Sequence, residues 1–360
     1  MDLDSQCWVV RAGNGSEFFQ HFIDNDLAAI GHFDEFINSE TKIDEVGFEN
    51  VVKDFYSDAK KKELSQQIIS ANVNQVRKFI FDMQVGNVIF TIGEHHVVAG
   101  IITSDAYVSE EYASKGDDPL TARDLSFKIR RNVAWGRLYP KEDIPAAVRR
   151  TFWANQTVFS ASEHTQSIYH WLNTVFISGM TVYASSRINQ KEHIHHYSVS
   201  QLSNTLNKLE ALSNIIEYRL LNKQSLDDIT LAEISECLNY LAGDNLLTLT
   251  TQQSFMSPGD YWTGFTGNSR EAVIAFALAF CCLLGVKPEF AEASDMKIAM
   301  KIEKPIEKLV SEIKIDNKIA IAEQKLELSF PYQNKKVVDK TEEIRKSRFP
   351  KVESSDKGIR

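Results

Sequence analysis

The chain has 360 residues, a length that predicts two domains, and its 43% hydrophobic and 25% charged residues are typical of soluble globular proteins. Its net charge of −9 argues against the broadly basic surface of a nonspecific nucleic-acid binder, so any such contact has to come from a local patch. The four cysteines lie at unrelated spacings, and residues 1–20 contain acids and no apolar signal-peptide core. We therefore expect reduced thiols in a cytoplasmic protein.

The beginning of the chain predicts a compact strand–turn–helix–strand unit. An alternating strand over 6–12 carries Trp8 and Arg11 into a Gly-Asn-Gly turn. Residues 16–26 then predict a short helix, and residues 27–31 predict a buried strand that ends in glycine. This order brings an aromatic ring, a guanidinium group and two glycines close together.

The next segment alternates between helical and strand patterns. Residues 40–80 follow a helical period, with a polar connection at 58–63 that separates two helices. Residues 86–92 and 97–103 predict the two strands of a hairpin.

The remainder of the first half adds two further strands. A polar loop over 109–121 leads to a strand over 126–138, and a helix over 144–152 follows, with Asp143 as its expected cap. Residues 157–159 predict a last short strand. Five or six short strands that are interrupted by helices indicate a small mixed barrel rather than a doubly wound sheet.

Several short motifs in this half occur in a distinctive order. W-x-x-R-A-G-x-G is followed by A-I-G, by G-N-V-I-F with a returning hairpin, and then by V-A-W, an acidic-Ile-Pro helix start and T-V-F. This order resembles the module that precedes the nuclease core in Mrr-type restriction endonucleases and related phage-defence proteins. That module is similar in organisation to the EVE and PUA-like barrels, whose members read modified or flipped bases. The resemblance covers residues 6–170 and implies a PUA/EVE-like, DNA-binding module in an antiviral, restriction-like system.

The resemblance also implies a base- or nucleotide-binding pocket. Its expected residues are Trp8, Arg11, Gly13, Gly31, His32, Trp135 and Thr157. An extruded base is held by stacking on aromatic faces and by hydrogen bonds to its edge, and glycines let backbone donors approach closely. His32 stands where related sequences carry tryptophan. The alternative is that Trp8 and Trp135 belong to the barrel core, and that Arg11 caps a loop or pairs with Asp34.

Basic residues cluster in two places. Six of them lie within 23 residues and are candidates for contacts with a nucleic-acid backbone: Lys128, Arg130, Arg131, Arg137, Arg149 and Arg150. The segment 331–360 is also basic, with nine Lys or Arg against five Asp or Glu from Lys335 onward. The alternatives are a solvated face for the first cluster and a disordered tail for the second.

The second half predicts more helix than strand. Residues 171–187, 191–200 and 246–255 predict strands. Residues 202–220 are clearly helical, and residues 225–242 predict one or two short helices.

The last predicted elements are two apolar helical segments. A sharp turn at 257–262 is expected to enter the largely apolar segment 272–286. Fifteen helical residues span about 22 Å, short of the ~30 Å hydrocarbon core, so a buried core helix is the better interpretation and membrane insertion the alternative. Residues 294–329 predict a long amphipathic helix that Pro305 starts or kinks.

The second half offers no convincing catalytic or metal site. His193, His195 and His196 invite a zinc interpretation, but the four ligands of a closed site are missing. A nuclease would need Asp316 with Glu323 and Lys325, which lie inside a helical pattern and not on adjacent strands. We therefore predict no catalytic residues, no metal and no cofactor.

These patterns together predict an α+β protein. A PUA/EVE-like mixed β-barrel with helices is expected over 1–170, a mainly α-helical domain with a few strands over 171–330, and a basic disordered tail over 331–360. The leading hypothesis is a non-enzymatic recognition protein that reads a modified base or nucleotide. Its C-terminal helices would couple this reading to a protein partner or to a homo-oligomer. The alternatives are an effector that acts on a membrane through 272–286 and an atypical magnesium-dependent nuclease.

Overall fold

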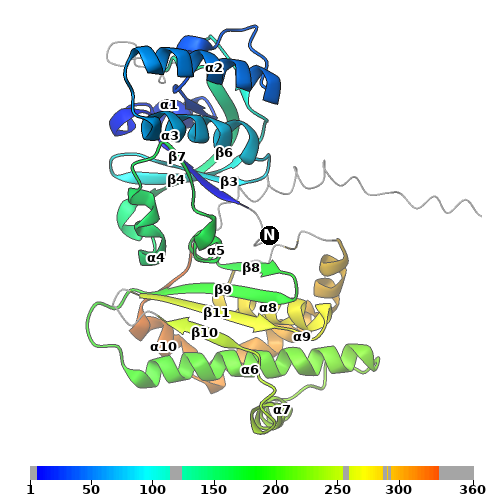
Figure 1. The fold of residues 1–360 in the computed structure, drawn as a ribbon. Coiled ribbons are helices and arrows are strands. Elements are labelled where there is room, and N and C mark those ends of the chain that lie inside the picture. Colours follow the sequence, from blue (N-terminus) through cyan, green and yellow to red (C-terminus); the bar gives the residue numbers. More distant parts are fainter. Residues whose placement is uncertain (1–5, 114–123, 254–258, 287–289, 291–292, 332–360) are drawn as a thin grey trace, which may run out of the picture. The chain divides into compact units, whose positions relative to one another are not determined.

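The computed structural model describes residues 6–113, 124–253, 259–286, 290 and 293–331 (Figure 1). The chain divides into two compact units, of which the first contains the described residues up to Ser167 and the second those from Ile168 onward. Residues 332–360 of the tail expected over 331–360, and most of the polar loop at 109–121, lie outside the described residues. Each unit is mixed α and β, in agreement with the expected α+β class.

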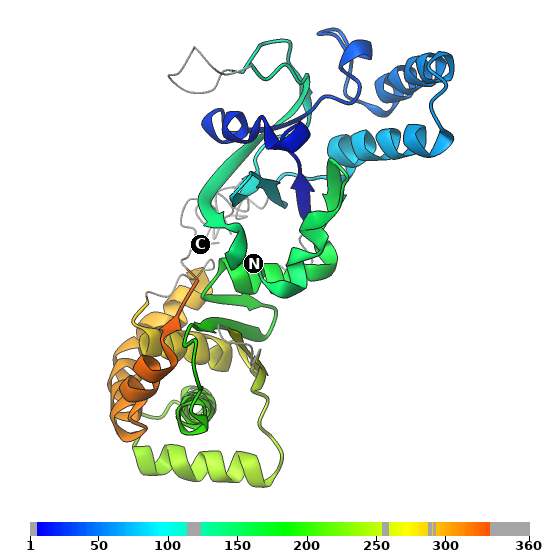
Figure 2. The same cartoon turned by 90° about the vertical axis from the view of Figure 1, so that its left-hand side faces the viewer.

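A seven-stranded sheet organises the first unit. Its strands are β1 (Cys7–Val10), β2 (Leu27–Ile30), β3 (Val88–Ile92), β4 (His96–Ile102), β5 (Tyr107–Val108), β6 (Ile129–Pro140) and β7 (Val158–Ser160). The order is β2-β6-β4-β3-β1-β7, with β5 also paired to β6. Strands β1 and β3 are parallel, and every other pair of this sheet is antiparallel. The sheet curls into a half-barrel, as Figures 1 and 2 show.

One glycine allows β4 and β6 to approach closely where their register shifts. The shift lies between Val98 and Gly100 of β4. A Cβ atom on Gly100 would lie 2.6 Å from the side chain of Val133 and 2.7 Å from that of Trp135. Only glycine therefore fits here, and the irregularity helps the sheet to curl.

Short helices surround this sheet. They are the 3₁₀ helix η1 (Asn14–Ser16), α1 (Phe19–Asp24), the 3₁₀ helix η2 (Asp34–Phe36), α2 (Glu45–Lys61), α3 (Gln66–Arg77), the π-helical turn η3 (Lys78–Asp82), the 3₁₀ helix η4 (Lys141–Asp143), α4 (Ala146–Arg149) and the 3₁₀ helices η5 (Thr151–Trp153) and η6 (Ser162–His164). The side chains of Asp44 and Ser65 cap α2 and α3 at their first turns.

Two predicted boundaries in this unit are wrong. Helix α2 continues to Lys61, so the connection that was expected over 58–63 is shorter and begins later. The helix expected over 144–152 is divided into α4 and η5, and Pro145 occupies the N-cap position without a side-chain hydrogen bond. Asp143 lies in η4 instead of capping this helix.

A five-stranded antiparallel sheet organises the second unit. Its strands are β8 (Val175–Ser178), β9 (Thr181–Ile188), β10 (Thr250–Gln253), β11 (Gly259–Thr266) and β12 (Leu328–Ser329), in the order β10-β11-β9-β12 with β8 also paired to β9. Its helices are α6 (His196–Leu221), α7 (Leu231–Gly243), α8 (Arg270–Leu284), α9 (Ala293–Asp316) and α10 (Ile319–Leu326). Helix α5 (Thr165–Leu172) spans the boundary between the units in sequence.

Helix α8 is the centre of the second unit's core. Eleven of its fifteen residues are buried, and it packs against β9, β11, α6 and α9. Ser269 caps its first turn, and Gly285 ends it in the left-handed conformation at φ 68°. The expectation of a buried core helix is therefore confirmed. Among the residues that the structure describes, no helix is long and apolar enough to cross a membrane.

Two predictions for the second half are wrong. Residues 191–195 form no strand, and α6 begins at His196 because the residues that follow bury a helical stripe that includes Ser198, Gln201 and Thr205. Tyr261 and Trp262 do not lie in a sharp turn. They belong to β11, which pairs with β9 over eight residues and buries every second side chain up to Phe265.

Candidate functional site

A cavity of about 480 Å³ in the first unit brings together most of the predicted pocket residues. It is lined by Arg11, Gly13, Asn14, Gly15, Ser16, Gly31, His32, Phe127, Asn155 and Thr157. Five of the seven residues expected from the sequence are in this set. Segments that are far apart in the chain, from the end of β1 to the start of β7, therefore converge on one cavity.

Arg11 follows β1 and is held by the loop that precedes β7. Its Nε donates to the carbonyl of Ala154 at 3.1 Å, and its Nη2 donates to the carbonyls of Phe152 and Ala154 at 2.9 and 2.7 Å. Nη1 donates to no acceptor in the described part of the chain. Burial lowers the pKa of the guanidinium group, which stays charged at neutral pH. Arg11 thus caps a loop, which was one of the alternatives considered from the sequence. Its Nη1 remains available as a hydrogen-bond donor.

The Gly-Asn-Gly turn forms a second wall of the cavity. Gly13 has φ 80°, and a Cβ atom there would lie 2.7 Å from the ring of Phe18, so only glycine is accommodated. Ser16 also has a positive φ, and its Oγ donates to the carbonyl of Ile92 at 2.5 Å. This bond ties the turn to β3, so the backbone of the turn is presented to the cavity by a fixed structure.

Phe127 provides the aromatic surface of the cavity. A Cβ atom on Gly31 would lie 2.5 Å from its ring, so glycine at this position lets the ring pack against the backbone. The ring also meets Phe18 edge to face at a centroid distance of 5.0 Å. Sequence reasoning missed Phe127, and the signal that could have found it is the glycine at the end of β2.

His32 lies in the cavity wall, as the resemblance implied. Burial lowers its pKa, and a side-chain hydrogen bond with Gln75 opposes this shift, so the imidazole is neutral at pH 7. Gln75 is itself buried on α3, and its Oε1 accepts from the backbone N–H of Thr157 at 2.6 Å and of Val158 at 3.1 Å. One buried amide therefore connects two residues of the cavity wall.

Trp8 and Trp135 do not line the cavity. Trp8 is 4% exposed and its Nε1 donates to Asn87 Oδ1, whereas Trp135 is 1% exposed and its Nε1 donates to the carbonyl of Leu27. Both belong to the core of the first unit. The alternative of a structural role is therefore confirmed for both tryptophans, because the inward face of a curled sheet buries its largest rings.

The prediction that Arg130 and Arg131 contact a nucleic-acid backbone is wrong. Arg131 is 1% exposed and donates to the carbonyls of Phe79, Ile80, Met83 and Ser104 at 2.7 to 2.9 Å. Burial lowers its pKa to about 10. Arg130 is 4% exposed and donates to the carbonyl of Phe127 at 2.7 Å. Neither side chain can reach a phosphate, because both are buried among backbone carbonyls.

Of the other four candidate basic residues, three contact groups of their own unit. Lys128 Nζ donates to the carbonyl of Ile37 at 2.6 Å, and Arg149 Nη2 donates to two carbonyls of the segment that precedes α4. The guanidinium of Arg137 lies over the ring of Tyr139 at 4.7 Å. Arg150 is exposed. Four of the six candidates are therefore bound to carbonyls of their own unit.

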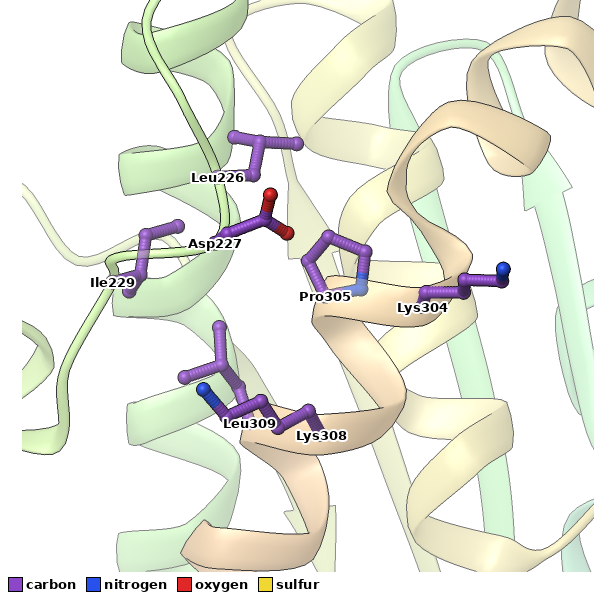
Figure 3. Close-up of a pocket in the computed structure, with 7 residues that line it drawn as sticks. All are labelled: Leu226, Asp227, Ile229, Lys304, Pro305, Lys308 and Leu309. Carbon is purple, nitrogen blue, oxygen red and sulfur yellow. The ribbon is translucent and has the colours of Figure 1, made fainter.

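The second unit also contains a cavity, which is smaller. It measures about 220 Å³ and lies between the loop that precedes α7 and the middle of α9 (Figure 3). Its lining residues are Leu226, Asp227, Ile229, Lys304, Pro305, Lys308 and Leu309. Both lysines are exposed, so this cavity lies at the protein surface beside the helical proline.

The residues of the nuclease alternative lie on helices. Asp316 ends α9 and forms an ion pair of 2.5 Å with Lys208, whereas Glu323 and Lys325 lie on α10. In the described part of the chain, no group of three or more His, Cys, Asp or Glu residues is placed to hold a metal ion. His193 and His195 lie in the exposed segment before α6.

Comparison of the chain with protein-family models, with curated proteins and with solved structures gave no match. The cavity of the first unit is therefore interpreted from its own residues.

Proposed function

We propose that the protein is a non-enzymatic recognition protein that binds a nucleobase or nucleotide in the cavity of its first unit. The observation that carries this proposal is the convergence of Arg11, Phe127, His32 and the glycine backbone on one cavity of about 480 Å³. Small-molecule sites have volumes of about 300–1,000 Å³ and combine an apolar surface with a few polar groups. A single base with its sugar fits within this range.

The chemistry of the lining suits a flat heterocycle. An extruded base is held by stacking on an aromatic face and by hydrogen bonds to its edge. Phe127 supplies a ring, Arg11 Nη1 supplies a donor, and Asn155 and Thr157 supply groups that can donate or accept. The backbone at Gly13 and Gly31 lies in the cavity wall, where the rings of Phe18 and Phe127 pack closely against it.

The second unit would couple ligand binding to a protein partner or to self-association. Its helices α6, α7 and α9 carry exposed apolar side chains, among them Tyr218, Tyr240 and Met300. Exposed large apolar residues of this kind are common at interaction surfaces. The resemblance of the first unit to the Mrr-type module supports a role in phage defence or restriction, in which the base that is read would be a modified one.

Binding of short oligonucleotides to the full chain tests this proposal. Single strands that differ only in one modified base are titrated against the wild type, Arg11→Met and Arg150→Met. We expect Arg11→Met to weaken binding, since it removes a donor from the cavity, and Arg150→Met to serve as a matched control outside it. The proposal is wrong if no strand binds, or if both variants bind like the wild type.

A further inference from the structure

The cavity lining contains a positively charged group, whereas the nearby acidic groups lie outside it. Of the described residues that line it, Arg11 alone carries a charge at neutral pH, because burial keeps His32 neutral. The two nearby acids, Glu17 and Asp34, are outside the lining. Glu17 Oε1 accepts from the backbone N–H of Asn14, and Asp34 Oδ1 accepts from that of Lys128 at 3.0 Å. The lining therefore offers a charged donor and no carboxylate.

Arg11 is oriented before any ligand enters. Three hydrogen bonds fix its Nε and Nη2 on the carbonyls of Phe152 and Ala154, so the plane of the guanidinium group is set by the protein. A guanidinium group has N–H donors and no acceptor, and Nη1 has no acceptor in the described residues. A ligand that enters the cavity has to supply that acceptor or leave a buried donor unsatisfied, which is unfavourable.

The uncharged groups of the lining do not favour a donor edge of a ligand over an acceptor edge. The side-chain amides of Asn14 and Asn155 can present either an oxygen or an N–H₂ group, and the hydroxyl of Thr157 can donate or accept. His32 adds no accessible group, because its Nε2 is buried and its hydrogen bond with Gln75 is made within the protein. Selection between ligand edges consequently depends on Arg11.

We propose that this cavity selects bases by a carbonyl edge, so that uracil- and guanine-type bases bind in preference to cytosine- and adenine-type bases. The 4-oxo group of uracil or the 6-oxo group of guanine accepts from Arg11 Nη1, whereas the 4-amino group of cytosine or the 6-amino group of adenine places a second donor against it. This inference rests on the proposed function and adds the class of base to it. The expected preference is about tenfold, since a single hydrogen bond to a charged group discriminates by about this much.

Matched nucleotides test the preference in the full chain. Calorimetric titration with uridine and cytidine 5′-monophosphates compares ligands that differ along one edge of the base, where uracil has a 4-oxo group and N3–H and cytosine has a 4-amino group and a bare N3. Guanosine and adenosine 5′-monophosphates form a second comparison. Sugar and phosphate are shared, so the ratio of affinities reports the base edge. Arg11→Gln should reduce the ratio to about one, because an amide can present either edge.

Each result decides a different point. Tighter binding of the uridine and guanosine ligands by the wild type supports the inference without any variant. Equal binding, or tighter binding of the amino-edged ligands, overturns the inference and leaves the proposed function intact. Competition of all four by inorganic phosphate alone overturns it as well, because Arg11 would then contact the phosphate. If no nucleotide binds, the proposed function fails and the inference fails with it.

Discussion

Two arginines of the first unit show how residue environment separates structure from function. Arg131 is 1% exposed and donates four of its five N–H groups to carbonyls, which hold η3, the residue after it and the segment after β4. Arg11 donates to two carbonyls and retains Nη1 at a cavity. The same side chain therefore serves the core in one case and a binding site in the other.

A buried histidine makes the stability of the second unit depend on pH. His170 is 2% exposed, stacks on Trp262 at 4.6 Å and shares a hydrogen bond of 2.8 Å with Ser185. Burial lowers its pKa from 6.5 to about 4. Between pH 6.5 and pH 4, His170 is protonated in the unfolded chain but neutral in the folded chain. The contribution of this group to the free energy of unfolding is therefore fully present above pH 6.5 and is lost as the pH falls to 4. We expect a loss on the order of 3 kcal/mol from this group.

Chemical denaturation of the full chain between pH 7 and pH 4 measures this loss. His170→Phe keeps an aromatic ring on Trp262 but cannot titrate, so its stability should fall less over this range. His193→Phe, in the exposed segment before α6, is the control. An identical pH dependence for His170→Phe and the wild type would contradict the prediction.

At the scale of elements, the cavity depends on a contact between α3 and β7. Gln75 on α3 accepts from the backbone of Thr157 and Val158, where β7 begins, and is hydrogen-bonded to His32 after β2. Backbone N–H groups at the start of a strand that lose their acceptor are costly when buried. Gln75 is thus a positioning residue for the cavity wall.

Gln75→Leu should destabilise the first unit by about 1–3 kcal/mol and weaken nucleotide binding, because two N–H groups lose their acceptor and His32 loses a partner. Gln75→Glu keeps the accepting oxygen and should retain more binding. Gln67→Leu, at an exposed position of the same helix, is the matched control. Thermal unfolding and calorimetric titration measure the two effects. Unchanged binding by a folded Gln75→Leu variant would show that the contact does not position the wall.

Local patterns predicted the elements better than they predicted side-chain roles. The hairpin of β3 and β4 and the buried helix α8 follow from residue periodicity and turn residues, which are local. The segment 191–195 was misassigned because His193, His195 and Tyr197 imitate strand alternation. Trp8 and Phe127 could not be distinguished as core and cavity residues, since that choice depends on how strongly the sheet curls. Gln75 carries no sequence signal, because Thr157 and Val158, whose backbone N–H groups it accepts from, lie more than 80 residues away.

At the scale of the whole chain, the two units have separate hydrophobic cores. One core contains Trp135 and Phe79 of the first unit, and the other contains Phe276 and Leu212 of the second. The two clusters share no residue among those that the structure describes. Units with their own cores commonly unfold as separate cooperative transitions.

Calorimetric unfolding of the full chain should therefore show two transitions that respond to different substitutions. Arg131→Met leaves four buried carbonyls without a donor and should lower only the first unit's transition, by about 3–5 kcal/mol, which corresponds to roughly 6–20 °C. Phe276→Ala opens a cavity in α8 and should lower only the second unit's transition, by about 3–5 kcal/mol. A single transition that both substitutions shift equally would mean that the units unfold as one cooperative body, and that ligand binding in the first unit stabilises the second directly.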